Sequence, residues 1–341
     1  MKKAEIRKKA YGLAVCLFAF LLSACSGLSV RNRQERTLFA MDTVMSLCVY
    51  GSSSDLDASE NLIKSIEKQL SVTDLQSDIH KLNESETFSV SSEVHELIEK
   101  ALDMCEQTDG ALDITIYPVV KAWGFTTGEY RIPESSELNG LLNMVDYSKV
   151  KLSEGKGVSL EKGMELDLGS VAKGYTGDRL MLLLKEQGVK SALVNLGGNV
   201  QTLGRKPDGS LWRIAIADPD DISSYLGYVE IEDKAVVTSG AYQRNFEESG
   251  KKYHHIIDPQ TGYPASNGLK SVTVIGESGF ECDALSTALF VMGLERSIDF
   301  CNNNDSIDAI LVADDGMVYI TKGLENIFVI QNGASVKVIL K

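Results

Sequence analysis

Apolar side chains recur at helical spacing along three stretches in the first half of the chain. Residues 55–71 and 92–106 place them three or four positions apart, which predicts two amphipathic helices. A third helix is expected from Val171 onward. Gly188 follows its last apolar position, where such a helix would end.

Most of the chain after residue 145 has the pattern of short strands separated by turn residues. Helical patterns at 280–292 and 294–303 interrupt this series. Because strand runs and helix runs alternate irregularly, the sequence predicts an α+β fold with mixed or antiparallel sheets and flanking helices, in preference to a doubly wound parallel sheet. The expected strands are 37–50, 147–152, 191–196, 199–203, 212–217, 226–231, 235–239, 252–257, 270–275, 308–313 and 317–320.

The first 24 residues are typical of a secretory signal peptide. A basic start precedes an apolar run from Leu13 to Leu22, which is too short to span a bilayer as a mature helix. Small residues then precede Cys25, as in bacterial lipoprotein signals. We expect cleavage before Cys25 and lipidation of its sulfur, with plain secretion as the alternative. The polar residues 25–36 are expected to tether a domain at 37–341.

The charge balance argues against a nucleic-acid partner. The chain has a net charge of −14, and its first 24 residues contribute +4, which leaves −18 for the rest. A surface this acidic repels nucleic acid, and it also repels anionic lipid headgroups. An acyl anchor, and not surface charge, is therefore expected to hold the protein at a membrane.

Four cysteines remain once the signal peptide and Cys25 are set aside. They are scattered, with no C-x-x-C pair, which argues against zinc-ribbon and thioredoxin-like sites. Outside the cytoplasm a disulfide is possible, but buried free thiols are the favoured interpretation. The four are Cys48, Cys105, Cys282 and Cys301.

The segment from Glu165 to Asp178 has the composition of an anion-binding turn. A short strand is expected through Leu166 and Leu168, followed by a turn at Gly169 and then a helix. Lys173 lies close to the predicted helix N-terminus, which itself attracts anions. The helix also contains two glycines, 174 and 177, which weaken it. A bound phosphate would explain these features, and incidental glycines in a strand-to-helix connection are the alternative.

A second candidate site, for a metal ion, is expected nearer the C-terminus. Asp283 and Thr287 are four residues apart in a predicted helix, so both face one side of it. Both supply oxygen, which Mg²⁺ prefers, and Mg²⁺ needs few protein ligands. The alternatives are a capping or solvated carboxylate and a threonine bonded to its own backbone.

Five short segments in series carry a resemblance to a known family. They are Asp109–Thr115, Lys121–Phe125, Thr238–Gly240, His255–Gly262 and Asp283–Thr287. In this order and spacing the set resembles the ApbE family. The resemblance implies a bilobal, T-fold-like domain with FAD in a central cleft. It also implies a magnesium-dependent lipoprotein that transfers FMN from FAD to a protein.

The resemblance also implies roles for individual residues. The metal ligands would be Asp283, Thr287 and the backbone carbonyl of Ser170. His255 would be catalytic, with help from Asp258, although Asp258 can also simply begin a turn with Pro259. The FAD contacts would fall on Met41, Ala111, Leu112, Asp113, Asp167, Lys173 and Ile257.

Some positions leave the interpretation open. Met41 and Ile257 can equally be core residues on strands. Thr238–Gly240 is expected to form a small-residue turn whose N–H groups can reach a phosphate. Thr73 stands where the family has an aromatic residue that would stack on a FAD ring, and Tyr130 or Trp123 is an alternative ring for that role.

Adjacent histidines at 254 and 255 are expected to point to opposite faces of a strand, so they cannot share one metal. His80 and His95 lie on helical patterns and are expected to be solvated.

The resemblance implies FAD:protein FMN transfer to a threonine or serine of a partner, with release of AMP. The expected partners are flavoprotein subunits of membrane redox complexes of the Rnf or sodium-translocating quinone reductase type. The expected location is outside the cytoplasm, lipid-anchored to a bacterial cell membrane. A magnesium-dependent FAD pyrophosphatase and a non-catalytic FAD-binding lipoprotein are the alternatives.

Overall fold

A nine-stranded sheet forms the centre of the molecule. The computed structural model describes residues 33–339, so the predicted signal peptide and Cys25 lie outside the described residues. The strands of this sheet are β1 (Arg33–Ala40), β2 (Thr43–Tyr50), β6 (Ala192–Leu196), β7 (Asn199–Leu203), β10 (Ala235–Gly240), β13 (Leu269–Gly276), β14 (Asp308–Ala313), β15 (Val318–Thr321) and β17 (Val336–Ile339). Their spatial order is β1-β2-β6-β7-β10-β13-β14-β15-β17. Neighbours are antiparallel except for β15 and β17, which are parallel.

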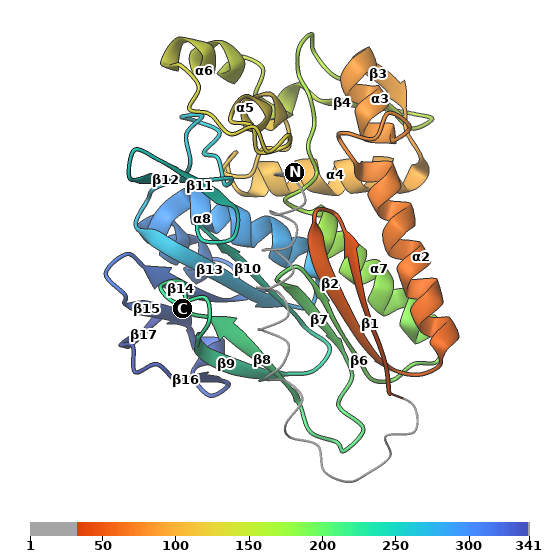
Figure 1. Ribbon diagram of the computed structural model, residues 1–341, viewed down its shortest axis with the longest axis vertical. Helices are drawn as coiled ribbons and strands as arrows, with labels where there is room; N and C mark the ends of the chain where they lie inside the picture. The colour runs from red at the N-terminus through yellow and green to blue at the C-terminus, as the bar shows by residue number, and fades with distance from the viewer. Residues whose placement is uncertain (1–32, 340–341) are drawn as a thin grey trace.

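Helices cover one side of this sheet and gather at one end of it (Figure 1). Two of them, α7 and α8, contact each other, and α8 packs on β10 and β13. In Figure 1 the shorter helices α5 and α6 lie side by side at the upper left, and α3 lies at the upper right near α2 and β3. The helices are α2 (Ser53–Leu70), α3 (Asp78–Ser85), α4 (Ser92–Gln107), α5 (Tyr117–Ala122), α6 (Ser135–Leu142), α7 (Ala172–Glu186) and α8 (Gly279–Asn302), with 3-10 turns η3 (Tyr147–Lys149) and η4 (Lys322–Leu324).

Three smaller sheets complete the fold. The sheet β16-β9-β8 packs on the central sheet, because buried residues of β8 and β9 share an apolar cluster with Val236, Ile275 and Ile310. The other two are the hairpin β11-β12 and the sheet β3-β5-β4. Their strands are β3 (Thr87–Ser89), β4 (Lys151–Ser153), β5 (Gly157–Ser159), β8 (Trp212–Ala217), β9 (Tyr225–Ile231), β11 (Asn245–Glu248), β12 (Lys251–His254) and β16 (Phe328–Ile330).

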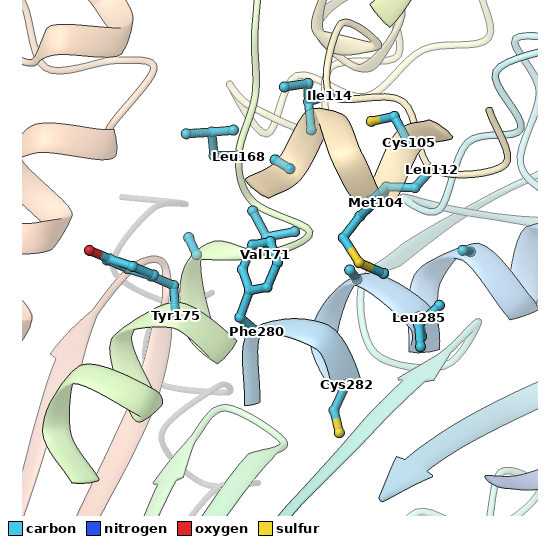
Figure 2. Packing of buried hydrophobic residues seen from close by; sticks show 14 of the residues in the cluster. Met104, Cys105, Leu112, Ile114, Leu168, Val171, Tyr175, Phe280, Cys282 and Leu285 are labelled. Atoms are coloured by element: carbon cyan, nitrogen blue, oxygen red, sulfur yellow. The ribbon is translucent and has the colours of Figure 1, made fainter. Parts of the chain in front are cut away.

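The largest apolar core lies where α4, the loop after it, α7 and α8 meet. In Figure 2, Met104 points toward α8, and Phe280 rises from the first turn of α8 toward Val171, which precedes α7. These residues are at most 9% exposed. Burial of this much apolar surface fixes the start of α7 relative to α8.

The α+β class and the mixed sheets confirm the fold predicted from the sequence. The two early helices also lie within a few residues of their predicted bounds. Some boundaries were wrong. β1 begins at Arg33, so the last four residues of the predicted tether belong to the first strand. The predicted strand 252–257 ends at His254.

Three further elements differ from expectation. The two predicted C-terminal helices are one helix, α8, broken at Gly293, whose φ of 78° only glycine adopts readily. The predicted strand 147–152 is the turn η3 followed by β4. Around Leu166 there is only an isolated bridge between Ile116 and Glu165, and no strand.

The four cysteines of residues 33–339 are buried and none of them is in a disulfide, so the disulfide alternative is wrong. Burial, with the nearby charge of Asp113, raises the pKa of Cys105 to about 12. In that same range no helix is both long and apolar enough to cross a membrane.

Candidate active site

Helices α7 and α8 cap each other with carboxylates. Asp283 of α8 accepts a hydrogen bond from the N–H of Gly174 in the first turn of α7, at 2.8 Å. Asp178 of α7 accepts from the N–H groups of Gly279 and Phe280 in the first turn of α8, at 2.6 and 3.0 Å. The first N–H groups of a helix have no partner within it, and its N-terminus carries partial positive charge, so both carboxylates are well placed.

The two glycines of α7 are explained by this packing. A Cβ atom at Gly174 would lie 2.1 Å from the carbonyl oxygen of Gly279. A Cβ atom at Gly177 would lie 2.1 Å from Nε2 of Gln201. Other atoms do approach the backbone closely at both glycines, as the sequence indicated, and these atoms belong to the protein. Packing against α8 and Gln201 therefore accounts for both glycines without a ligand.

Lys173 places a positive charge beside Asp283. Its Nζ lies 3.6 Å from Oδ2 of Asp283 and donates a hydrogen bond to the carbonyl oxygen of Gly169 at 3.2 Å. Burial raises the pKa of Asp283, which is 3% exposed, and the Lys173 charge and the Gly174 N–H act in the opposite direction. The effect of burial is larger than the effects of Lys173 and Gly174, so the pKa of Asp283 lies above its ordinary value.

Hydroxyl groups from α8 and β10 meet about one helical turn after Asp283. Ser239 Oγ lies 2.8 Å from Ser286 Oγ and 3.4 Å from Thr287 Oγ1. The expected strand 235–239 is confirmed as β10, which extends to Gly240 and pairs with β13, so the turn expected at Thr238–Gly240 begins only after Gly240. Sequence reasoning did not identify Ser239 as a side-chain contact of Thr287.

The residues here suit a hard divalent cation better than a softer one. In the part of the chain that the structure describes, no three His, Cys, Asp or Glu side chains come together as a metal site. What the chain offers is one buried carboxylate, Asp283, with the hydroxyl of Thr287 one helical turn away. A single carboxylate completed by neutral oxygens, water and phosphate is what Mg²⁺ accepts. The donor set therefore fits Mg²⁺.

The loop predicted to contact FAD is held by its own aspartate. Oδ1 of Asp113 accepts from the N–H and the hydroxyl of Thr115 at 2.8 and 2.6 Å, and Oδ2 accepts from the N–H of Tyr147 at 3.1 Å. The side chains of Ala111 and Leu112 are buried in the main core.

The turn that contains Asp167 lies beside this loop. The N–H of Asp167 donates to the carbonyl oxygen of Ile114 at 2.8 Å, and its carboxylate accepts from the N–H of Gly169 at 2.8 Å. Burial raises the pKa of Asp167. The charges of Arg244 and Lys173 act against that rise in the pKa. Ser170, the predicted carbonyl ligand, lies in the same turn, between Gly169 and α7.

Met41 lies at the tip of the β1–β2 hairpin and not within a strand. Met41 and Asp42 both adopt left-handed backbone conformations, with φ of 48° and 57°. Such strain in residues other than glycine often marks a functional position. The N–H of Met41 donates to Oε1 of Glu67 at 2.6 Å, and its sulfur lies 3.9 Å from Oγ1 of Thr176. The hairpin tip is therefore held against α2 and α7.

His255 and His254 differ as expected from their adjacent positions. Nδ1 of His255 lies 3.2 Å from the carbonyl oxygen of Arg244. A carbonyl only accepts, so Nδ1 carries the proton and Nε2 is left as an acceptor. Burial and the charge of Arg244 lower the pKa of His255 to about 3, so the ring is neutral at physiological pH. His254 is buried, and its Nε2 bonds to the carbonyl oxygen of Ala265 at 2.9 Å.

Arg244 is a site residue that the sequence gave no reason to select. It lies between β10 and β11, outside the recognisable motifs. Its guanidinium donates to the carbonyl oxygen of Phe125 at 2.8 Å and lies 4.0 Å from Asp42. It joins three segments around His255 through packing between residues distant in sequence, and no local pattern reports that.

The remaining predicted residues fall in other places. Asp258 shapes its own turn, because its carboxylate accepts from the N–H of Gln260 at 2.9 Å. With Ala111 and Asn267, it lines a cavity of about 560 Å³ near the break in α8. Ile257 is buried against Trp123 in a small cluster.

The proposed substitute rings are partly excluded. Trp123 is fully buried and donates to the carbonyl oxygen of Gly262 at 2.8 Å, so it cannot stack on a ligand. Tyr130 is 43% exposed but already stacks on Phe246, with ring centroids 5.0 Å apart. His80 and His95 are half-buried and not solvated, and Nδ1 of His80 bonds to the carbonyl oxygen of Val72.

Known proteins resemble this chain over most of its length. Residues 41–311 match the model of the ApbE family. The chain belongs to the ApbE family. An FAD:protein FMN transferase of Klebsiella pneumoniae is 38% identical over 257 residues, which is 74% of this chain and 79% of that protein. One from Treponema pallidum is 31% identical, covering 92% of this chain and 93% of its own length.

Solved ApbE structures share the fold. The ApbE protein of Thermotoga maritima superimposes with a TM-score of 0.81 at 33% identity, over 86% of this chain and 98% of that one. The flavinyl transferase ApbE of Pseudomonas stutzeri, in its apo form, gives a TM-score of 0.78 at 29% identity, over 88% and 99%.

Proposed function

We propose that this ApbE-family chain is an FAD:protein FMN transferase. It would move FMN from FAD to a threonine or serine hydroxyl of a partner protein and release AMP. The relatives named above carry this activity in their names. The observation that carries the proposal is the hydrogen bond between Nδ1 of His255 and the carbonyl oxygen of Arg244, which leaves Nε2 available as an acceptor.

His255 would act as the general base. Its Nδ1–H is held by the carbonyl oxygen of Arg244, so the free Nε2 can accept the proton of the incoming hydroxyl. The hydroxyl oxygen forms a bond to the phosphorus of the FMN half. The bond from that phosphorus to the bridging oxygen breaks, and AMP leaves with the bridging oxygen.

The pKa of His255 limits its basicity until the substrate is bound. Arg244 and Lys173 both lower this pKa, because two positive charges oppose a third. The diphosphate of FAD brings negative charge to the same place and offsets the two cations. Binding of the substrate would therefore raise the pKa of His255 toward the range in which it is an effective base.

Asp283, Thr287 and the carbonyl of Ser170 would hold Mg²⁺. When bound, the ion would neutralise charge on the diphosphate and on the leaving group. Lys173 contributes a fixed positive charge on the same side, 3.6 Å from Asp283. Asp283 itself is fixed by the N–H of Gly174, so it needs little reorganisation to receive a cation.

The partner is proposed to be a flavoprotein subunit of a membrane redox complex, of the Rnf or sodium-translocating quinone reductase type. The sequence around Cys25 supports a lipid anchor outside the cytoplasm, where such subunits would be met. Cys25→Ser should release the protein from the membrane fraction. A membrane-bound Cys25→Ser protein would argue against the anchor.

The assay that tests the transfer is AMP release from FAD in the presence of Mg²⁺, with and without an acceptor domain. A transferase releases AMP only when the acceptor is present, in equal amount to the FMN bound to that acceptor. AMP and free FMN in equal amounts without an acceptor would identify a pyrophosphatase. Bound but intact FAD under both conditions would identify a binding protein.

A further inference from the structure

Arg244 connects three segments at the rim of the site. Its guanidinium donates to the carbonyl oxygen of Phe125 at 2.8 Å, just after α5. It also lies 4.0 Å from the carboxylate of Asp42, at the strained tip of the β1–β2 hairpin. Its own carbonyl oxygen accepts from the backbone N–H of His255 at 3.1 Å, and from Nδ1 of the same residue at 3.2 Å. The backbone that orients the base therefore also carries the guanidinium.

The guanidinium has donors left for a ligand. A guanidinium carries five N–H groups in a planar fork. The bond to Phe125 uses one of them, and the Asp42 carboxylate at 4.0 Å is too distant for a hydrogen bond. Asp42 is 76% exposed at its side chain, so water weakens this ion pair. The fork is therefore able to bind a phosphate with two parallel bonds.

Arg244 and Lys173 act on the same two groups from different elements. Lys173 belongs to the first turn of α7, whereas Arg244 follows β10. The positive charges of both lower the pKa of Asp167 and that of His255. The hydrogen bonds agree with this, because Lys173 donates to the carbonyl oxygen of Gly169, whose N–H donates to Asp167, while the carbonyl oxygen of Arg244 bonds to His255. The chain as a whole has a net charge of −14 and repels anions. Two cations that act on the same place would therefore attract a small anion with several charges, such as a diphosphate, to that place.

We propose that Arg244 binds the phosphate of the FMN half of FAD, next to His255, and holds it for attack by the acceptor hydroxyl. This inference rests on the proposed function, because it places the transferred phosphate beside the base. Lys173, on the far side next to Asp283, then faces the phosphate that leaves with AMP. Arg244 also ties the orientation of the base to the position of the phosphate, since one residue contacts both.

The test compares flavins with and without a phosphate. Binding of FMN and of riboflavin is followed by flavin fluorescence for the wild-type chain, Arg244→Gln and Arg244→Lys. Arg213→Gln is the matched control, because Arg213 is an exposed arginine on β8 paired with Glu230. Arg244→Gln should weaken FMN binding about tenfold or more, while riboflavin binding changes by less than about twofold. Arg244→Lys should be intermediate, and Arg213→Gln should match the wild type.

Equal weakening of both flavins would mean that Arg244 only supports the fold, and unchanged FMN binding would mean that it does not contact the phosphate. Either result overturns the inference. An NMR titration of His255 in the ligand-free protein gives a second readout. Arg244→Gln should raise the pKa of His255, and an unchanged pKa also overturns the inference.

Failure here is distinct from failure of the proposed function. If the wild type transfers FMN but Arg244→Gln binds FMN normally, only the role of Arg244 is wrong. If the wild type transfers FMN to no acceptor, the proposed function is wrong, whatever Arg244 binds.

Discussion

The carboxylate of Asp283 accepts a hydrogen bond from the backbone N–H of Gly174 at 2.8 Å, across the contact between α8 and α7. The negative carboxylate of Asp283 therefore caps the N-terminus of α7, which carries partial positive charge. This bond also places the predicted metal ligand next to Lys173 and the turn that contains Ser170. The geometry of the candidate site therefore depends on how closely two helices approach.

A methyl group at Gly174 should separate these helices. The Cβ atom of Gly174→Ala would lie 2.1 Å from the carbonyl oxygen of Gly279 and 2.7 Å from Cβ of Asp283. Overpacking of this kind lowers the free energy of unfolding by about 1–3 kcal/mol. Urea unfolding should show this loss, together with weaker Mg²⁺ dependence of transfer.

Gly140→Ala is the control for helix propensity. Gly140 lies in α6, has nothing within 4 Å of an added Cβ, and has an ordinary backbone conformation. This substitution should raise the free energy of unfolding by about 0.5–1 kcal/mol. If Gly174→Ala is as stable as the wild type, the close contact of α7 and α8 is not needed.

Asp283→Asn should remove the response to Mg²⁺. The amide oxygen can still accept from Gly174, but the charge that attracts the cation is gone. FMN transfer should fall about a hundredfold or more, a loss of several kcal/mol in stabilisation of the transition state. Rates measured across a Mg²⁺ titration check this. A rate and a Mg²⁺ midpoint equal to those of the wild type would exclude Asp283 as a ligand.

Asp178→Asn separates helix capping from metal binding. Asp178 caps α8 as Asp283 caps α7, but it faces Gly279 and Phe280. Loss of its charge should lower the free energy of unfolding by about 1 kcal/mol, as for other caps. The Mg²⁺ concentration for half-maximal transfer should stay the same.

His255→Gln should slow transfer about 10²–10⁴-fold while FAD binding changes little, because a general base acts in the chemical step. Its neighbour is the control. His254→Gln loses the bond to Ala265, so it should lower the free energy of unfolding by about 1 kcal/mol and keep most of the transfer rate. Transfer rates with saturating FAD distinguish the two. A fully active His255→Gln protein would contradict the proposed role.

The stability of the ligand-free protein should fall as the pH is lowered from 6.5 toward 3. His255 has a pKa of about 3 in the folded chain against an ordinary value of 6.5, so within this window the unfolded state binds the extra proton. One such group contributes at most about 1.4 kcal/mol per pH unit. Urea unfolding at pH 7 and pH 5 should show a smaller loss for His255→Gln. If the wild type and His255→Gln lose the same free energy of unfolding between pH 7 and pH 5, folding does not lower the pKa of His255.

The parts of the site that follow local rules could be predicted from the sequence. Helical spacing alone put Asp283 and Thr287 four residues apart in one helix, α8. The expectation that His254 and His255 cannot share one metal agrees with their different partners, although β12 ends at His254. Short motifs also pointed to the turn that contains Asp167. These predictions need only the period of one element, which the sequence carries directly.

The other parts depend on contacts between distant residues. Gly174 was taken for a ligand position because its close neighbour, Gly279, is more than a hundred residues away. The turn after β10 was placed at Thr238–Gly240, too early, because the pairing of Gly240 with Ser271 of β13 is not visible locally. Arg244 lies outside the recognisable motifs, and its importance comes from the three segments that it joins.

Intact-mass measurement of an acceptor domain tests the transfer of FMN most directly. The chain is incubated with FAD, Mg²⁺ and a flavoprotein domain of the proposed partner class. We predict that the acceptor gains the mass of one covalently bound FMN, at a threonine or serine hydroxyl, and that the gain is absent with Asp283→Asn and strongly reduced with His255→Gln. An acceptor mass that never changes, with every such domain tried and with folded protein that binds FAD, would contradict the proposed transfer.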